Sequence, residues 1–442
     1  MARKMSAMRM RTIDIWEKEK TVMSKNISRR NFLKVSALGA LGMTAIGSIA
    51  MAEENKGAGG KAGLAPVFDG YGSKYEYGHF TVEATVIDAN NEEFNPNASF
   101  SIYHIMDYTA EVPYADSMAT NGATAENNTA SMYVITSGKD ALLVDMGNGA
   151  ASTASHFGED KEDAAVLEKI NTEYRDLVLS LAGERELKIA ITHKHGDHVG
   201  FSSAMEGLGL TVLFPEGDVT DSIKERFANF DFQTFVPGEY QIPVGEIMID
   251  TIFCPGHTDA STIYVINTPV ITYNYGATHA TATYISFIGD AIGSGSSVWI
   301  FSLDGLKQFE AGIDAAVEKL EGYTLFDAGL GAGEQTGAKM LLLGGHGWQY
   351  QNAFGTMNMD IEYAKSMQNL IHVLHDSDKW AYDGVDGLDF KAWMKRGNIA
   401  LKDVGSNGRY TSYFGTTLTS AGAITCPLEA MRQFAGQISE DA

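Results

Sequence analysis

The amino-acid sequence predicts an α+β fold arranged as a four-layer αββα sandwich, with extensions at both ends. Two observations lead to this prediction. Strand-like and helix-like segments alternate through the middle of the chain, and several apolar strand-like runs end directly at a histidine or an aspartate. With 442 residues, 44% of them hydrophobic and 10% aromatic, the chain is long enough to bury a large core in one or two domains.

Each element is predicted from its apolar pattern. Runs rich in β-forming residues predict strands, and apolar residues at helical spacing predict helices. Strands are expected at residues 80–86, 132–136, 141–145, 187–192, 211–214, 246–253, 261–266, 282–288, 339–343, 410–414 and 422–425. Helices are expected at residues 166–181, 219–227, 306–320 and 362–375. The turn Ser137-Gly138-Lys139-Asp140 joins two of the strands into a hairpin.

The charge limits the classes of partner, and the cysteine count limits the disulfide bonds that the chain can form. A formal net charge of -23 repels phosphate backbones and anionic headgroups, so neither nucleic acid nor a stable membrane partner is expected. The two cysteines, Cys254 and Cys426, are too few for a disulfide scaffold. Cys254 is expected to be a small buried hydrophobic residue, with a single Cys254–Cys426 bridge as the alternative.

The N-terminus carries an export pattern. Ser28-Arg29-Arg30-Asn31-Phe32-Leu33-Lys34 is followed by a weakly apolar run at 35–51 and by small residues at Ala50 and Ala52. This order resembles a twin-arginine (Tat) signal peptide. The resemblance implies recognition by the Tat export machinery and a final location in the periplasm, outside the cell or on its surface.

The leader is expected to span residues 1–52, and Met23 offers an alternative start within it. A short membrane anchor is the competing interpretation of the apolar run. Roughly 17 apolar residues rich in Gly and Ala are marginal for spanning a bilayer. We therefore expect an exported protein.

The most informative stretch is Thr192-His193-Lys194-His195-Gly196-Asp197-His198-Val199-Gly200. Three imidazoles and a carboxylate in so short a segment are difficult to explain as core packing, and they are ligands that borderline-soft divalent metals prefer. Alternate residues of a tight loop can point the same way. His193 and His195 could thus face one ion while Asp197 and His198 face a second.

The spacing His-x-His-x-Asp-His resembles the signature of the metallo-β-lactamase superfamily. Single residues further along the chain match the later ligands of that family, and each follows a strand: His257 after Pro255-Gly256, Asp290 after Gly289, and His346 after Gly344-Gly345. Asp145, within Leu142-Leu143-Val144-Asp145-Met146-Gly147, matches the family's first motif. The resemblance covers roughly residues 131–350.

This resemblance implies a site for two metal ions, with zinc expected and iron or manganese as alternatives. Seven ligands would form it: His193, His195 and His257 on the first ion, Asp197, His198 and His346 on the second, and Asp290 between them. Asp145 would contact the ligands rather than the metals.

The implied reaction is hydrolysis. Two ions that share a water lower its pKa toward about 7, which gives a metal-bridging hydroxide as nucleophile at neutral pH. Asp197 would relay a proton as the leaving group departs. The substrate would be a small molecule with an ester, thioester, lactone or amide bond. The implied domains are a linker and β-rich extension over 53–130, a catalytic domain over 131–380, and a C-terminal extension over 381–442 that could complete the sheet.

Aromatic residues near the ligands set the expectation for the substrate. Trp299, Trp348 and Tyr350 follow Asp290 and His346 closely, and they either line an apolar substrate pocket or belong to the core. Two other functions stay open. One is a mononuclear iron oxidoreductase similar to the persulfide dioxygenases of this fold, and the other is a non-catalytic metal- or partner-binding protein of the cell envelope.

Overall fold

The structure is a computed structural model, and it describes residues 74–86, 100–109, 130–273, 280–293, 297–324, 338–346, 359–376, 400–404, 410–416 and 421–439. All of these except 273 and 280 belong to one compact unit, Gly59–Thr272 with Thr281–Ala442. The other unit, Met1–Ala58 with Tyr273–Ala280, lies almost entirely outside the described residues, and so does the expected leader. Across the described ranges, no helix combines the length and the apolar character needed to cross a membrane.

The first sheet contains eight strands in chain order. They are β1 (Lys74–Tyr77), β2 (Phe80–Val86), β3 (Phe100–Met106), β4 (Ser131–Ser137), β5 (Asp140–Val144), β6 (Glu186–Ala190), β7 (Thr211–Pro215) and β8 (Asp231–Phe235). Neighbours from β1 to β5 are antiparallel, and neighbours from β5 to β8 are parallel. The N-terminal strands therefore continue the same sheet that carries the predicted hairpin β4–β5.

Parallel strands need crossover connections, and helices supply them here. These are α4 (Ala150–His156), α5 (Ala164–Ala182), α6 (Gly196–Val199), α7 (Ser202–Met205), a 3₁₀ turn (Glu216–Asp218) and α8 (Asp221–Arg226). In α5, the Asp163 side chain accepts a hydrogen bond from the Ala165 backbone N at 2.8 Å and so caps the first turn. Gly183, with a φ of 63°, ends the helix.

The second sheet has six strands in the order β15-β14-β12-β11-β10-β9. They are β9 (Gln241–Val244), β10 (Ile247–Phe253), β11 (Thr262–Tyr273), β12 (Ala280–Gly289), β14 (Lys339–Gly344) and β15 (Met359–Asp360). β12 and β14 are parallel, and α9 (Leu303–Thr324) forms the crossover between them. Two more helices follow along the chain, α10 (Ile361–His375) and α12 (Leu428–Phe434).

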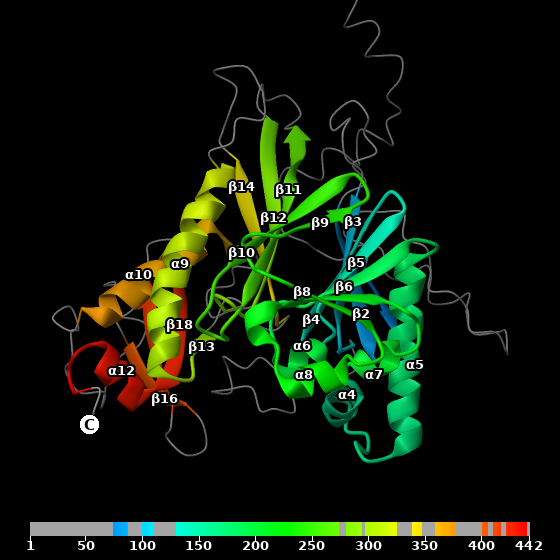
Figure 1. Ribbon diagram of the computed structural model, residues 1–442, viewed down its shortest axis with the longest axis horizontal. Coiled ribbons are helices and arrows are strands. Elements are labelled where there is room, and N and C mark those ends of the chain that lie inside the picture. Colours follow the sequence, from blue (N-terminus) through cyan, green and yellow to red (C-terminus); the bar gives the residue numbers. More distant parts are fainter. Residues whose placement is uncertain are drawn as a thin grey trace, which may run out of the picture. The chain divides into compact units, whose positions relative to one another are not determined.

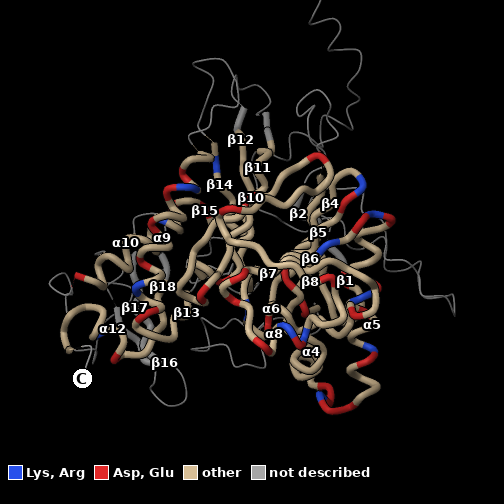
Figure 2. The backbone as a smooth tube through the Cα atoms, viewed as in Figure 1, with Lys and Arg blue, Asp and Glu red and all other residues tan. Residues whose placement is uncertain are grey.

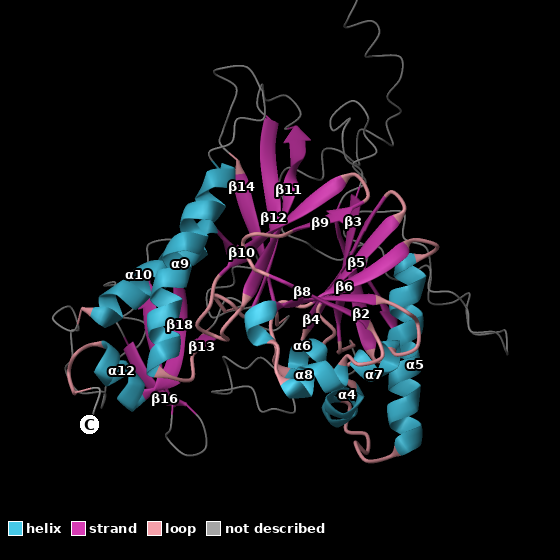
Figure 3. Ribbon diagram, viewed as in Figure 1, coloured by secondary structure: helices cyan, strands magenta, loops and turns pink. Residues whose placement is uncertain are grey.

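These elements lie in four layers, as Figures 1 and 3 show. Three apolar clusters fill the spaces between the layers. On the outer face of the first sheet, the rings of Tyr174 in α5 and Phe201 stack at 4.2 Å. Between the two sheets, the rings of Tyr133 and Phe287 lie 5.0 Å apart. On the outer face of the second sheet, α9 and α10 pack with residues such as Phe309. The predicted αββα sandwich is confirmed.

The C-terminal strands form a third sheet instead of extending either large one. It pairs β13 (Val298–Trp299), β18 (Ala421–Pro427), β17 (Tyr410–Thr416) and β16 (Ala400–Val404) in that order. β15 occupies the edge of the second sheet beside β14, and β18 pairs with β13. Completion of a large sheet by this extension was therefore the wrong expectation for the described strands. Cys254 and Cys426 are both buried and free.

Most of the remaining predicted elements agree with the structure to within a few residues, but the strand expected at 261–266 is longer and continues as β11 to Tyr273. The helix expected at 219–227 is shorter, because Thr220 accepts a hydrogen bond from the Ile223 backbone N at 3.2 Å and caps α8 there. Charged residues lie mainly on helices and connecting loops, whereas the strands of the two large sheets carry few (Figure 2).

Candidate metal centre

The candidate ligands lie where strands end. His193 follows β6, His257 follows β10, Asp290 follows β12 and His346 follows β14. Because β12 runs parallel to β14, their carboxyl ends meet at one edge of the second sheet, and Gly345 N donates to Gly289 O at 2.9 Å there. The two large sheets thus deliver their ligand loops to one place.

Three histidines form what we call the first group: His193, His195 and His257. The Nε2 atom of His257 lies 3.2 Å from Nε2 of His193 and 2.9 Å from Nδ1 of His195. His193 is completely buried, and His257 is nearly so. The predicted set for the first ion is therefore brought together.

Asp197, His198 and His346 form the second group. Asp290 lies between the two groups: its Oδ2 atom is 3.0 Å from His346 Nε2, 3.6 Å from His198 Nε2 and 3.7 Å from His257 Nε2. This is the position expected for a carboxylate that bridges two ions.

The residues fit a divalent metal by a test independent of the motif. Nε2 of His198 and Oδ1 of Asp290 are buried and have no hydrogen-bond partner among the described residues. Buried polar atoms are almost always satisfied, so unsatisfied ones facing a cluster of ligand atoms need an explanation. Gly345 keeps this space clear, because a Cβ there would lie 2.5 Å from Asp290 Oδ1 and 2.8 Å from His198 Cε1. Imidazole nitrogens and carboxylate oxygens are ligands that zinc takes.

Asp145 contacts a member of the second group. Its Oδ2 atom lies 2.8 Å from Nδ1 of His198, and its two oxygens accept from the backbone N and the hydroxyl of Thr192, each at 2.7 Å. These contacts turn Nε2 of His198 toward the other ligands. On the first group, Nδ1 of His257 donates to the backbone carbonyl of Trp299 at 2.6 Å.

The two groups differ in the pKa values of their histidines. Burial and the neighbouring imidazole of His198 lower the pKa of His193 well below its usual range, and burial with His257 lowers the pKa of His195 to about 4. Burial also lowers the pKa of His257. The first group is therefore neutral at neutral pH, which is the metal-binding form of histidine.

The second group pairs charges instead. Burial lowers the pKa of His198, but the carboxylates of Asp145 and Asp290 outweigh it and hold that pKa well above its usual range. The pKa of His346 is likewise raised, because Asp290 outweighs burial. Burial alone would raise the pKa of Asp290, yet the two imidazoles hold it well below its usual range. In the second group, the imidazoles of His198 and His346 and the carboxylate of Asp290 therefore favour one another's charged forms.

The aromatic expectations have mixed outcomes. Trp299 is 37% exposed, and its backbone carbonyl rather than its ring makes the contact to His257. Trp348 and Tyr350 lie outside the described residues. Phe301, which the sequence did not single out, is 45% exposed, and its ring lies 5.6 Å from the ring of His195 and 5.8 Å from that of His257.

Two buried aspartates near the site were also missed. Asp107, directly after β3, accepts from Asn148 Nδ2 and Thr153 Oγ1, both at 3.2 Å. Burial raises its pKa to about 7, although these hydrogen bonds oppose the shift. Asp218, at the end of the 3₁₀ turn, contacts both loops of the first group. Neither has a sequence signature, since each is a single aspartate outside any motif.

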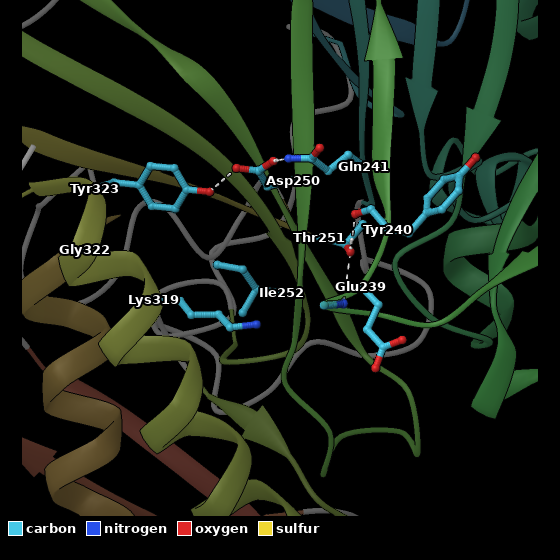
Figure 4. Close-up of a pocket in the computed structure, with 10 residues that line it drawn as sticks. Glu239, Tyr240, Gln241, Asp250, Thr251, Ile252, Lys319, Gly322 and Tyr323 are labelled. Atoms are coloured by element: carbon cyan, nitrogen blue, oxygen red, sulfur yellow. Dashed lines mark hydrogen bonds between the residues drawn. The ribbon is translucent and has the colours of Figure 1, made fainter.

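A separate hollow of about 520 Å³ lies between the β9–β10 hairpin and α9 (Figure 4). The Tyr323 hydroxyl donates to Asp250, whose other oxygen accepts from Gln241 at 2.5 Å. Lys319 and Ile252 line the same hollow. None of its lining residues belongs to the seven candidate ligands, so it is a different feature from the metal centre.

A scan against protein-family models gave no match, and a search of curated proteins gave none either. Solved structures similar to this chain include a metallo-β-lactamase from Staphylococcus aureus subsp. aureus COL (16% identity, 61% of this chain and 61% of that chain, TM-score 0.33). Others are a metallo-β-lactamase from Pontibacter korlensis (13% identity, 66% and 99%, TM-score 0.35) and ETHE1 from Myxococcus xanthus (18% identity, 55% and 79%, TM-score 0.32). The chain thus spans 61% of the length of the first of these. Identities and TM-scores this low carry no conclusion about what the chain does.

Proposed function

We propose that this chain is an exported hydrolase of the metallo-β-lactamase type that works with two bound metal ions, of which zinc is the first candidate. One observation carries the proposal. Oδ2 of Asp290 lies within 3.0–3.7 Å of imidazole nitrogens from both groups. In the part of the chain that the structure describes, Oδ1 of the same carboxylate and Nε2 of His198 are buried and have no hydrogen-bond partner. A carboxylate placed between two ligand sets can serve both ions of a binuclear site.

The seven residues divide as the two groups divide. His193, His195 and His257 would hold one ion, Asp197, His198 and His346 the other, and Asp290 both. When bound, such a pair of ions lowers the pKa of a shared water toward about 7 and polarises the oxygen of the scissile bond. The protein contributes the fixed geometry, because Asp145 and the Trp299 carbonyl each orient one imidazole.

Asp197 is the candidate proton carrier. Its side chain is 28% exposed, compared with 16% for Asp290, so it is the carboxylate of the set nearer to solvent. Burial would raise its pKa, but His198 and His346 outweigh this effect and lower it. Asp197 is therefore ionised at neutral pH and can accept a proton and pass it to a departing alkoxide, thiolate or amine.

The substrate would be an uncharged or partly apolar small molecule with an ester, thioester, lactone or amide bond. The exposed ring of Phe301 beside His195 offers an apolar surface next to the reacting bond. The lysine inside the motif, Lys194, is paired with Asp218 and Asp259 at 3.4 and 3.0 Å, so its charge is already balanced. Recognition of a phosphodiester or a carboxylate tail would require a free cation here.

Export is proposed from the leader sequence Ser28-Arg29-Arg30-Asn31-Phe32-Leu33-Lys34. The twin-arginine route moves folded proteins, so the metal ions would be acquired before export to the periplasm or beyond. N-terminal sequencing of the mature protein tests this step. A mature N-terminus close to Glu53 is expected, and one far from it would contradict the proposed leader.

The activity test is a panel of chromogenic ester, thioester, lactone, phosphodiester and β-lactam substrates. Turnover of one acyl class is expected, and the double variant His195→Ala/His198→Ala should lose on the order of a thousandfold or more, because each group loses a ligand. The matched control is His372→Ala/His375→Ala, which removes two exposed histidines of α10 that pair with Asp314 and Glu310.

Unchanged activity in the ligand variant would contradict the binuclear mechanism. Metal binding without turnover of any substrate would instead favour a binding protein. Oxygen consumption with one iron per chain would favour a dioxygenase.

A further inference from the structure

We infer that Asp218 is the positioning residue of the first group and sets how tightly that group binds its ion. The inference rests on the proposed metal centre, of which Asp218 is not a ligand. Asp218 ends the 3₁₀ turn after β7, and its side chain is 0% exposed. A buried carboxylate is unfavourable unless donors surround it, so its donors indicate its role.

Four donors surround Asp218, and they come from two loops. Oδ2 accepts from the backbone N of Lys194 at 3.0 Å and from Thr258 Oγ1 at 2.7 Å. Oδ1 accepts from the backbone N of Ala260 at 3.1 Å, and Nζ of Lys194 lies 3.4 Å from it. The carboxylate therefore connects the loop around Lys194 to the loop that holds Thr258 and Ala260.

These two loops carry the whole first group. Lys194 stands between His193 and His195, and Thr258 directly follows His257. A shift of either loop would separate Nε2 of His257 from its neighbours, which now lie at 2.9 and 3.2 Å. Asp218 bonds to both loops at once and is buried, whereas the Lys194–Asp259 pair that also joins them is exposed.

The neighbourhood of Asp218 is built to keep this connection fixed. A Cβ at Gly217 would lie 3.0 Å from the Cβ of Ala260, so the turn packs directly on the second loop. The Thr258 backbone N donates to Ser261 Oγ at 3.1 Å, which holds that loop in its own turn. Nζ of Lys194 also pairs with Asp259 at 3.0 Å and remains 26% exposed. The lysine thus balances the buried charge of Asp218.

The second group has a different support. Asp145 bonds to His198 at 2.8 Å, whereas none of the hydrogen bonds of Asp218 within the described residues reaches a member of the second group. Loss of a residue that orients ligands typically weakens metal binding about 10–100-fold. Asp218→Asn should have this effect on the first group alone, because an amide accepts on only one side.

The experiment is a zinc titration of the metal-free full-length protein against a competing chromophoric chelator. Wild type is expected to bind two ions per chain tightly. Asp218→Asn should keep one tight ion and bind the other about 10–100-fold more weakly. The matched control, Asp259→Asn, removes the exposed partner of Lys194 but leaves Asp218, and it should bind like wild type.

Ligand variants identify which position is weakened. In a protein that already carries His195→Ala, Asp218→Asn should cause no further loss of zinc affinity, because both changes act on the first group. Combined with His198→Ala, it should weaken the ion that His198→Ala alone retains. Any of three results would overturn the inference. The affinity losses of Asp218→Asn and His195→Ala could be additive, Asp218→Asn could bind zinc like wild type, or it could weaken the binding of both ions equally.

Thr258→Val is a milder second variant that removes one donor at similar volume. It should weaken the first ion in the same direction, and unchanged affinity in a folded protein would overturn the inference even if Asp218→Asn fails to fold. A wild-type protein that binds no metal would instead refute the proposed function. Because the readout is metal affinity, absence of turnover leaves this test intact.

Discussion

Oδ2 of Asp145 lies 2.8 Å from Nδ1 of His198, and this contact determines which way the His198 ring faces. Asp145 has a φ of 61°, a left-handed backbone conformation that is uncommon outside glycine. Such a conformation persists only where the surroundings hold it, and here the backbone N and hydroxyl of Thr192 do so at 2.7 Å. The carboxylate of Asp145, at the end of β5, thus fixes the orientation of the His198 ring.

Asp145→Asn should weaken metal binding at the second group about 10–100-fold. The amide keeps an oxygen on one side only, so either Thr192 or His198 loses its partner. Zinc titration of the metal-free protein measures the effect. The exposed residue Asp221 provides the control variant Asp221→Asn, which should bind as wild type does. Equal affinity in Asp145→Asn and wild type would argue against the orienting role.

Gly345→Ala should reduce activity and metal content together. The new Cβ would meet Asp290 Oδ1 at 2.5 Å and His198 Cε1 at 2.8 Å, and both would have to move. Loss of about tenfold or more in metal affinity is expected, as for other changes that displace ligands. The control is Gly196→Ala, also beside the ligands, where a Cβ meets nothing within 4 Å. Two variants with the same small effect would show that the space around Asp290 is not critical.

Phe301→Ala should raise KM for an apolar substrate about tenfold while kcat changes little. The ring is exposed and lies beside His195 and His257 rather than between ligand atoms, so it would bind ground state and transition state equally. Steady-state kinetics on the best substrate of the panel separates the two parameters, with Phe301→Leu as the conservative variant. A fall in kcat at constant KM would place the ring in the chemistry instead.

Asp107→Asn should change how stability depends on pH. Between its usual pKa of 3.8 and the raised value of about 7, the folded protein keeps a proton on Asp107 that the unfolded chain has released. The stability contributed by this carboxyl therefore falls as pH rises through that window. Relative to wild type, Asp107→Asn should gain stability from pH 4 to pH 8, up to a limit of about 4 kcal/mol.

Urea denaturation at several pH values measures this difference. Asn148 and Thr153 can still donate to the amide oxygen, so the part of the difference that depends on pH isolates the charge. A constant difference across the pH range would mean that Asp107 is not protonated in the folded protein near neutral pH.

The candidate ligands could be named from the sequence because they match a family motif in residue type, spacing and order. Four lie in one short loop, and His257, Asp290 and His346 each come directly after an apolar strand. The strand ends place these side chains in loops, and the strand pairing and sheet packing then bring those loops together. The same local patterns place the helices and strands of the two large sheets.

Contacts between distant segments could not be read in this way. Asp218 matters because its turn meets the loop after His257, a pairing that no spacing in the sequence records. Phe301 lies beside His195 and follows β13, which pairs with β18 more than a hundred residues further along the chain. Neither contact leaves a pattern in the sequence.

The most direct test of the binuclear site is elemental analysis of the purified mature protein, with metals counted per chain. Two groups that share Asp290 predict two ions per chain, zinc first among them, and about one ion after His198→Ala. A single ion in the wild-type protein that survives His198→Ala but not His195→Ala would contradict the second group. Asp290 would then not bridge two ions.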